Sequence, residues 1–321
     1  MGSAERWPYD VLIVSPNSAV DSYYIFSDLR LGAVNRALRV IHTAGGKGNN
    51  MARALASLGG RAMSLGVVGG YAGQFIAGEL DREGIAHDLV WVDVETRHCN
   101  TLLVEGCQET TVVLEPGLPA ADGVPGELAA RVLRHAQEAP FLALMGSLPA
   151  SFPADYYAKL IHQLEDIPVQ VCVDCSGEAL RLAAEAGPAL VKVNRAELCE
   201  AFGLEPATAD WPDFQAVAAR LPVELLIVTD GPRGAYVFPK GGPALHALTP
   251  VQTWVSTAGA GDTFLAGLLL AQGSGKNLSE AIRFASAAAS ANLQQVVCGF
   301  LLPKDVERFL GATSVTQLGA V

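Results

Sequence analysis

Short, uninterrupted apolar runs that alternate with longer Ala- and Leu-rich segments are the feature of this sequence that most constrains its fold. A strand buried on both faces is apolar at every position, and such strands form parallel sheets when helices separate them. The expected strands are residues 11–14, 62–68, 141–145, 169–174, 190–193 and 225–229. The expected helices are 47–58, 154–164, 179–186 and 214–220, with two more within 263–295. The pattern predicts an α/β fold whose ligand site lies at the carboxyl ends of the strands.

Two stretches depart from this alternation. Residues 23–41 and 89–114 contain strand-like patterns with no helix between the successive pieces. Parallel neighbours need a long crossover connection, so strands joined in this way do not easily enter the parallel layer. We therefore expect a small antiparallel sheet beside the main one. It would cover a pocket as a lid or pair with the lid of a second copy.

The charge and hydropathy of the chain argue against several classes of partner. Asp and Glu outnumber Lys and Arg by 33 to 22, which gives a net charge of −11, and no three basic residues are consecutive. Binding to nucleic acid or anionic lipid needs a basic patch, so we expect neither partner. No apolar stretch approaches the length of about eighteen residues that indicates a membrane helix. The first ten residues lack the apolar core of a secretory leader, so we expect a cytoplasmic protein.

The segment VSTAGAGDTF at residues 255–264 is the sharpest chemical signal. Gly259 and Gly261 allow a tight turn that exposes successive backbone N–H groups at the start of an apolar helix, where anionic oxygens bind. Asp262 is an unusual residue in a loop that only binds phosphate. A carboxylate there can accept a proton from a hydroxyl while the amides stabilise a transferring phosphoryl group. The alternative is that Asp262 is a helix N-cap in an ordinary turn.

The segment AGGKGNNMARALASLGG at residues 44–60 is the second signal. Gly45 and Gly46 would let a ligand approach the backbone closely. Lys47 offers a point charge for a phosphate or hydroxyl group, and Asn50 offers paired polar contacts. The alternative is a Gly-rich turn with a solvated lysine.

Together these two segments resemble the signature regions of the PfkB (ribokinase-like) carbohydrate kinases, and most of all their hexose-phosphate branch of 1-phosphofructokinases, tagatose-6-phosphate kinases and minor 6-phosphofructokinases. The resemblance extends over about residues 11–309 and includes the segments at 17–21, 32–37, 95–97, 146–149, 174–180 and 192–197. It implies a three-layer αβα sandwich with a mostly parallel central sheet and a small β-sheet lid. One kinase domain would span residues 8–321, with lid strands from about 19–41 and 89–114.

The resemblance implies transfer of the γ-phosphoryl group of ATP to a hydroxyl of fructose 1-phosphate, fructose 6-phosphate or tagatose 6-phosphate. Asp262 would be the catalytic base, and Gly259, Ala260 and Gly261 would form the anion hole. Mg²⁺ would accompany the nucleotide, with K⁺ near the loop of Ser256. The resemblance also implies a homodimer that forms through the lid.

The remaining site residues follow from the same resemblance. The residues expected at the nucleotide are Asn194, Glu197, Thr229, Gly231, Gly234 and Asn292, of which Glu197 would act on Mg²⁺ through water. The residues expected at the sugar are Asp21, Gly46, Lys47 and Asn50, while Arg97 and Ser147 would hold the substrate's own phosphate.

One departure from the family pattern lies in the lid. The branch usually has Arg-x-Asn, whereas this chain has Arg97-His-Cys-Asn100, one residue longer. Because side chains alternate along a strand, we expect Asn100 to face the other side of the lid.

Three other functions stay open at this point. The first is a kinase for an unphosphorylated sugar or nucleoside, and the second is a non-catalytic regulator that binds a sugar or nucleotide. The third is an NAD-linked dehydrogenase. The chain disfavours it because no G-x-G-x-x-G motif follows the first expected strand.

Overall fold

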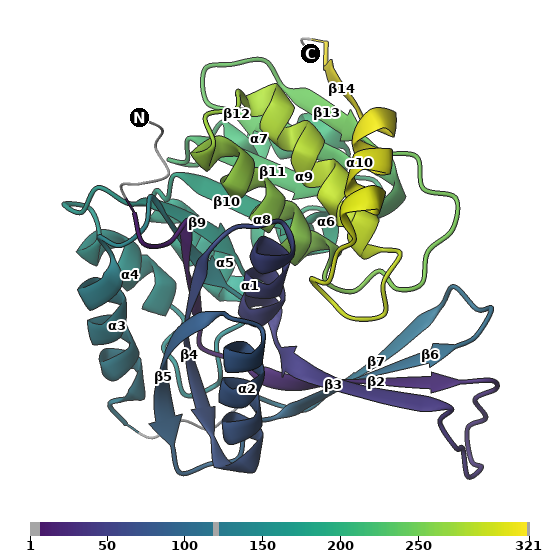
Figure 1. Cartoon of the computed structure of the whole chain (residues 1–321). Helices are drawn as coiled ribbons and strands as arrows, with labels where there is room; N and C mark the ends of the chain where they lie inside the picture. Colours follow the sequence, from purple (N-terminus) through teal and green to yellow (C-terminus); the bar gives the residue numbers. More distant parts are fainter. Residues whose placement is uncertain (1–6, 118–121, 320–321) are drawn as a thin grey trace.

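The computed structural model describes residues 7–117 and 122–319, so residues 118–121, 320 and 321 of the predicted domain lie outside it. Ten strands of the described residues form one large sheet (Figure 1). Their spatial order is β14 (Ser314–Gln317), β13 (Leu245–Leu248), β12 (Ala235–Pro239), β11 (Leu225–Thr229), β10 (Leu190–Asn194), β9 (Gln170–Asp174), β8 (Phe141–Met145), β1 (Val11–Ser15), β4 (Ala62–Gly69) and β5 (Ala86–Val92). Strands β11 to β5 in this order are parallel, and β12, β13 and β14 add an antiparallel edge.

Helices cover both faces of this sheet (Figure 1). One face packs against α3 (Val124–His135), α4 (Tyr156–Gln163), α5 (Gly177–Glu185), α6 (Arg195–Phe202) and α7 (Trp211–Ala218). The other face packs against α1 (Lys47–Ser57), α2 (Gly70–Arg82), α8 (Ala260–Gly273) and α9 (Leu278–Asn292), and α10 (Pro303–Ala312) packs on α9. In β1, Leu12 and Val14 enter the first core, while Val11 and Ile13 enter the second. Burial on both faces is why these strands are apolar throughout, and the predicted α/β architecture is confirmed.

A separate four-stranded sheet projects from the main body as the lid (Figure 1). Its order is β3 (Arg39–Gly45), β2 (Ala19–Phe26), β6 (His98–Val104) and β7 (Thr110–Leu114). The outer pairs are antiparallel, but the central pair, β2 and β6, is parallel. The expectation of a fully antiparallel lid is therefore wrong for its central pair, since the chain builds α1, β4, α2 and β5 between β3 and β6.

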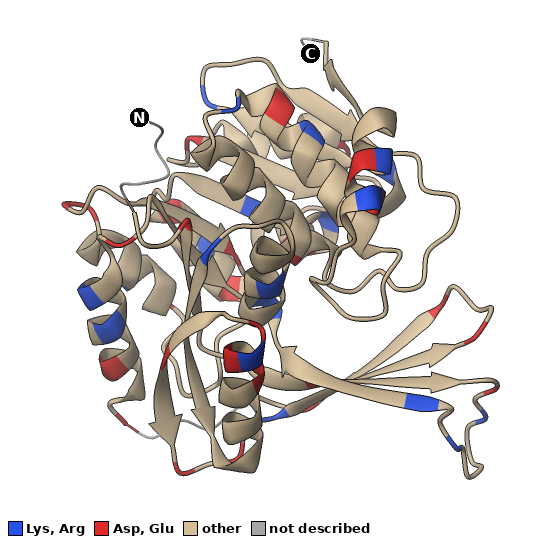
Figure 2. Ribbon diagram, in the orientation of Figure 1, with Lys and Arg blue, Asp and Glu red and all other residues tan. Residues whose placement is uncertain are grey.

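The expected lid segment 89–114 also begins too early. Strand β5 pairs in parallel with β4, from Met63 opposite Ala86 to Gly69 opposite Val92, so residues 89–92 belong to the large sheet. Charged residues of both signs are interspersed over the helices, whereas the lid strands carry few of them (Figure 2). Within the described part of the chain, no helix has the length and apolar character needed to span a membrane.

Candidate active site

The carboxyl ends of the central strands and the base of the lid enclose a cavity of about 260 Å³. Asp174 ends β9, Asn194 ends β10 and Thr229 ends β11, while Ser147 lies two residues after β8. Ligands in open parallel sheets bind at this edge, because loops diverge there and leave a crevice.

All six residues expected at the substrate line this cavity: Asp21, Gly46, Lys47, Asn50, Arg97 and Ser147. Of the other predicted site residues, only Gly259 contributes to its wall. The lining residues to which the sequence analysis gave no role are Ser15, Asn17, Cys99, Thr101, Val112, Leu114, Gly146, Ser176, Ala258 and Cys298. The lid and the loop before α8 therefore both contribute to the wall of this cavity.

Asp262 lies in the first turn of α8, beside the cavity. It is 5% exposed, and its Oδ2 accepts a hydrogen bond of 3.1 Å from the Asn50 Nδ2, a residue that lines the cavity. Burial raises the pKa of Asp262 to about 6, and the nearby Asp174 charge adds to the rise. A carboxylate with this pKa is ionised at neutral pH and still basic enough to accept a proton.

The turn before Asp262 requires glycine. Gly259 has a φ of 76°, and a Cβ there would lie 2.6 Å from the Cβ of Cys298. A Cβ on Gly261 would lie 2.5 Å from Nζ of Lys192. The amides at the start of α8 are therefore backed by a lysine ammonium, an arrangement that favours an anion.

A buried ion-pair network lies next to this turn. Lys192 and Asp174 are 3% and 0% exposed, and Lys192 Nζ donates to Asp174 Oδ2 at 2.6 Å. Burial would raise the pKa of Asp174, but Lys192 and Lys47 outweigh it and hold that pKa below its ordinary value. Sequence reasoning gave neither Asp174 nor Lys192 a role. Both are charged residues in mostly apolar strands, and strand alternation assigns both to the face that α8 covers. A charge in such a strand was the signal in the sequence that could have identified them.

Lys47 joins the same network. Its Nζ donates to Asp174 Oδ1 at 2.6 Å and to Glu197 Oε1 at 2.9 Å. Burial would lower the pKa of Lys47, but these two carboxylates outweigh it and raise that pKa above its ordinary value. Lys47 thus bridges the cavity and the residues expected at the nucleotide, with two of its three N–H donors already in use.

Asp21 is the second buried carboxylate of the cavity. It packs so closely on the backbone that a Cβ at Gly45 would overlap its carboxyl group. Burial raises the pKa of Asp21 to about 6, with Arg53 opposing the rise and the Asp262 charge adding to it.

Arg97, Asn17 and Ser147 form a polar cluster at the cavity. The Nη2 of Arg97 donates to the Asn17 carbonyl at 3.2 Å, and the Asn17 Nδ2 donates to the Ser147 hydroxyl at 3.0 Å. Arg97 Nε and Asn17 Oδ1 are buried without a partner, as is Asn50 Oδ1. Buried polar groups normally find partners, so these three atoms stay available to a polar ligand.

The residues expected at the nucleotide lie outside this cavity. Asn194 and Glu197 form a capping box at the start of α6, in which each side chain accepts a hydrogen bond from the other's backbone N–H. Thr229 donates to the Val193 carbonyl at 3.3 Å. Near it, Gly231 and Gly234 have φ values of 52° and 86°.

Asn292 is 1% exposed and supports the loops around the glycine turn. It donates to the Ala258 carbonyl at 2.8 Å and accepts from the Gly299 N–H at 2.7 Å. Its expected contact with the nucleotide stays a prediction.

The lid strand β6 alternates as expected. Cys99 and Thr101 line the cavity, and Asn100 between them does not. The extra residue after Arg97 thus places a thiol in the cavity wall.

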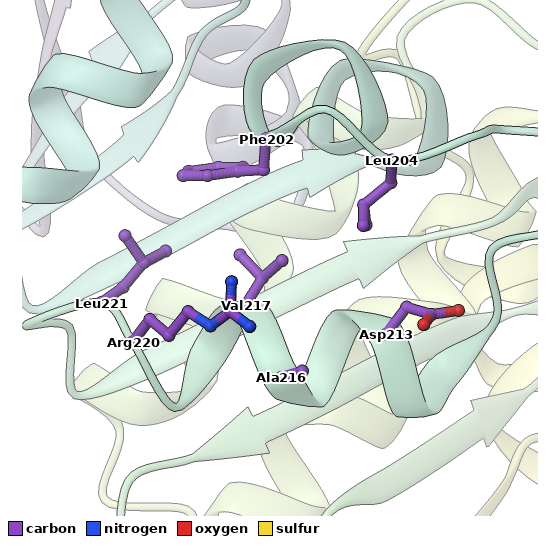
Figure 3. Close-up of a pocket in the computed structure, with 7 residues that line it drawn as sticks. All are labelled: Phe202, Leu204, Asp213, Ala216, Val217, Arg220 and Leu221. Atoms are coloured by element: carbon purple, nitrogen blue, oxygen red, sulfur yellow. The ribbon is translucent and has the colours of Figure 1, made fainter.

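A second pocket, of about 200 Å³, lies between the end of α6 and α7. Figure 3 shows Phe202 on one side of it and Val217 and Arg220 on the other. It shares no residue with the first cavity, and Asp213 at its edge serves the N-cap of α7. We therefore place the active site in the first cavity.

The sequence matches the pfkB family of carbohydrate kinases over residues 15–305. The chain belongs to this family. The chain is thus a carbohydrate kinase, and the resemblance found in the sequence is confirmed.

Solved structures agree with this assignment. Phosphofructokinase-2 from Escherichia coli in complex with fructose-6-phosphate has a TM-score of 0.84 and 26% identity, over 94% of this chain and 98% of that one. Ribokinase from Arabidopsis thaliana with ribose and ATP has a TM-score of 0.71 and 25% identity, over 94% and 98%. A possible 1-phosphofructokinase from Thermotoga maritima has a TM-score of 0.87, over 97% and 100%, and its 22% identity indicates the shared fold alone.

Proposed function

We propose that this carbohydrate kinase transfers the γ-phosphoryl group of ATP to a hydroxyl of a hexose phosphate: fructose 1-phosphate, fructose 6-phosphate or tagatose 6-phosphate. The observation that carries the proposal is the set of unpartnered buried atoms around one cavity. Arg97 Nε is a donor for a phosphate oxygen, while Asn17 Oδ1 and Asn50 Oδ1 are acceptors for hydroxyl groups. A substrate that carries both phosphate and hydroxyls satisfies all three.

The proposed chemistry places the acceptor hydroxyl between Asn50 and Asp262. Asp262 takes the hydroxyl proton as the oxygen forms its bond to the γ-phosphorus, and the bond from that phosphorus to the ADP oxygen breaks. The amides of Gly259, Ala260 and Gly261 stabilise the charge on the transferring group, and Lys192 beneath Gly261 reinforces them.

The lid would keep water, a competing acceptor, away from the reaction. Cys99, Thr101, Val112 and Leu114 of the lid wall support this role. At the lid tip, the Trp254 indole donates to the Gln108 carbonyl at 3.2 Å and joins the lid to the loop before the glycine turn.

The metal requirement is proposed from the family and fits the residues present. Within the described ranges, no three His, Cys, Asp or Glu side chains converge on a metal position. Glu197 uses Oε1 for Lys47 and Oε2 for the Asn194 N–H, so it would act on Mg²⁺ through water, as this ion commonly allows. Bound Mg²⁺ would neutralise charge on the nucleotide phosphates. K⁺ near the loop of Ser256 is proposed because E. coli phosphofructokinase-2 has been solved with potassium.

A homodimer through the lid is also part of the proposal. The lid carries few charges (Figure 2), and it exposes three large apolar side chains: Val40 at 41%, Val113 at 50% and Leu38 at 59%. Exposed apolar patches on a protein surface are typical of contacts with another protein. Light scattering tests it: the wild type should have the mass of two chains, and Val113→Lys should shift the mass toward one chain. A wild-type monomer at micromolar concentration would contradict the dimer.

A substrate panel with an ADP-release assay tests the activity. We expect turnover with at least one of the three hexose phosphates, and Arg97→Ala should raise its KM at least about tenfold, as loss of a charge-assisted contact predicts. Arg181→Ala on the exposed face of α5 is the matched control and should leave KM unchanged. Turnover confined to unphosphorylated sugars or nucleosides would overturn the proposed substrate, and absence of turnover with the whole panel would favour a regulator.

A further inference from the structure

Glu95, Thr96 and Arg97 lie where the chain leaves the large sheet and enters the lid. They follow β5 and precede β6 (Figure 1). Only Arg97 lines the cavity. The other two residues have no part in the proposed chemistry, yet both are bound tightly to the end of β4 and the start of α2.

Thr96 is locked onto Gly69, the last residue of β4. It is 1% exposed, and its backbone N–H donates to the Gly69 carbonyl at 3.0 Å. Its hydroxyl accepts from the Gly69 N–H at 2.8 Å and lies 3.1 Å from the Gly69 carbonyl. Gly69 has no room for a side chain, because a Cβ would overlap the carbonyl of Val94. The crossing segment is thus held directly against β4.

Glu95 is held by the first turn of α2. Its carboxylate accepts from the Ala72 N–H at 2.5 Å and from the Tyr71 N–H at 3.2 Å. Gly70 has a φ of 66°, and a Cβ there would overlap this carboxylate. A carboxylate at a helix N-terminus satisfies free N–H groups and complements the helix dipole. Glu95 therefore fastens the base of the lid to α2.

The contacts of Thr96 with β4 and of Glu95 with α2 fix the backbone just before Arg97. Its backbone carbonyl accepts from the Val20 N–H at 3.0 Å, which starts the pairing of β6 with β2. Its guanidinium reaches the carbonyls of Asn17 and Glu115, both at 3.2 Å. The Cα of Arg97 is thus fixed between Thr96 on one side and the lid on the other.

We propose that Thr96 and Glu95 are positioning residues that aim Arg97 at the substrate's phosphate. This inference rests on the proposed function, because it assumes that Arg97 binds that phosphate. It implies that Thr96 and Glu95 affect affinity for the phosphorylated substrate through their contacts with β4 and α2, without touching the substrate themselves.

The experiment measures KM and kcat for the hexose phosphate with the full-length enzyme. Thr96→Val leaves the buried Gly69 N–H without its acceptor and should raise KM about tenfold, with kcat within about twofold of the wild type. Thr96→Ser keeps the hydroxyl and should restore KM to within about twofold. Glu95→Gln should raise KM about threefold, since an exposed capping carboxylate contributes less. Glu280→Gln, in the capping box of α9, is the matched control and should leave KM unchanged.

A double-mutant cycle separates positioning from general loss of stability. In the Arg97→Ala background, Thr96→Val should cause no further rise in KM. If Arg97→Ala raises KM and Thr96→Val does not, the positioning role is overturned while the proposed function stands. Additive effects on KM in the double variant would overturn the positioning role in the same way. Unchanged KM in Arg97→Ala would overturn the proposed function and this inference with it.

Discussion

The side-chain amide of Asn50 donates a hydrogen bond of 3.1 Å to the carboxylate of Asp262. The two residues are 212 positions apart and come from the first turns of α1 and α8. The hydrogen bond orients one oxygen of the carboxylate and leaves Asn50 Oδ1 buried without a partner. A hydroxyl group bound there would lie within reach of both side chains, which is the geometry that a general base requires.

The acidic limb of the pH profile should follow the two buried carboxylates. Because burial raises the pKa values of Asp262 and Asp21 to about 6, a proton occupies the base as the pH falls below that value. We expect kcat/KM to decrease by about tenfold per pH unit there, because the protonated carboxyl cannot accept the hydroxyl proton.

The variant Asp21→Asn identifies the origin of this limb. A substrate phosphate also titrates at about pH 6, but this substitution leaves the substrate unchanged. Removal of one negative charge should lower the pKa of Asp262 and move the limb to lower pH, because the interaction is reciprocal. A limb that stays in place or moves to higher pH contradicts the assignment to these carboxylates.

The buried pair of Lys192 and Asp174 should dominate the stability of the site. Lys192→Met leaves a fully buried carboxylate whose remaining ion pair, with Lys47, is shared with Glu197. Loss of one partner of a buried pair costs about 3–5 kcal/mol of unfolding free energy.

The matched control for Lys192 is an exposed ion pair between a lysine and a carboxylate. Lys240 and Glu224 lie 2.9 Å apart and are more than half exposed, so Lys240→Met should cost less than about 1 kcal/mol. Urea denaturation at pH 7 measures both variants. Equal losses in the two would show that the buried network contributes no special stability.

Gly259→Ala should damage the anion hole. The residue has a positive φ, and the new Cβ would press on Cys298, so the turn must shift. We expect kcat to fall about 10²-fold, comparable to the loss of one oxyanion donor. Gly78 lies in α2 with nothing near its Cβ position, so Gly78→Ala should leave kcat unchanged and stabilise the fold by about 0.5–1 kcal/mol. Wild-type kcat in Gly259→Ala would show that the turn does not require glycine.

Local chemistry made several parts of the protein predictable from sequence. The expected strands 141–145 and 225–229 coincide with β8 and β11, because each is a continuous apolar run that ends at a glycine turn. The turn before Asp262 was predictable in the same way, since its glycines and the apolar helix that follows lie within ten residues.

Long-range pairing was not predictable. Nothing near Lys47 in the sequence indicates its bonds to Asp174 and Glu197, which are 127 and 150 residues away. Helix α2 has interior glycines that weaken its helical pattern, and without a helix before it β5 resembles a lid strand. Recognition of that helix would have made β5 a crossover strand of the large sheet.

The role of Asp262 as the base is tested most directly by kcat of Asp262→Asn, measured with the hexose phosphate that the wild type uses. The amide keeps the shape of the side chain and removes its basicity, so kcat should fall about 10³- to 10⁴-fold, while ATP affinity measured by titration should change less than twofold. Asp305→Asn, in the first turn of α10, is the matched control and should retain wild-type kcat. A kcat of Asp262→Asn within tenfold of the wild type would contradict the assignment of Asp262 as the base.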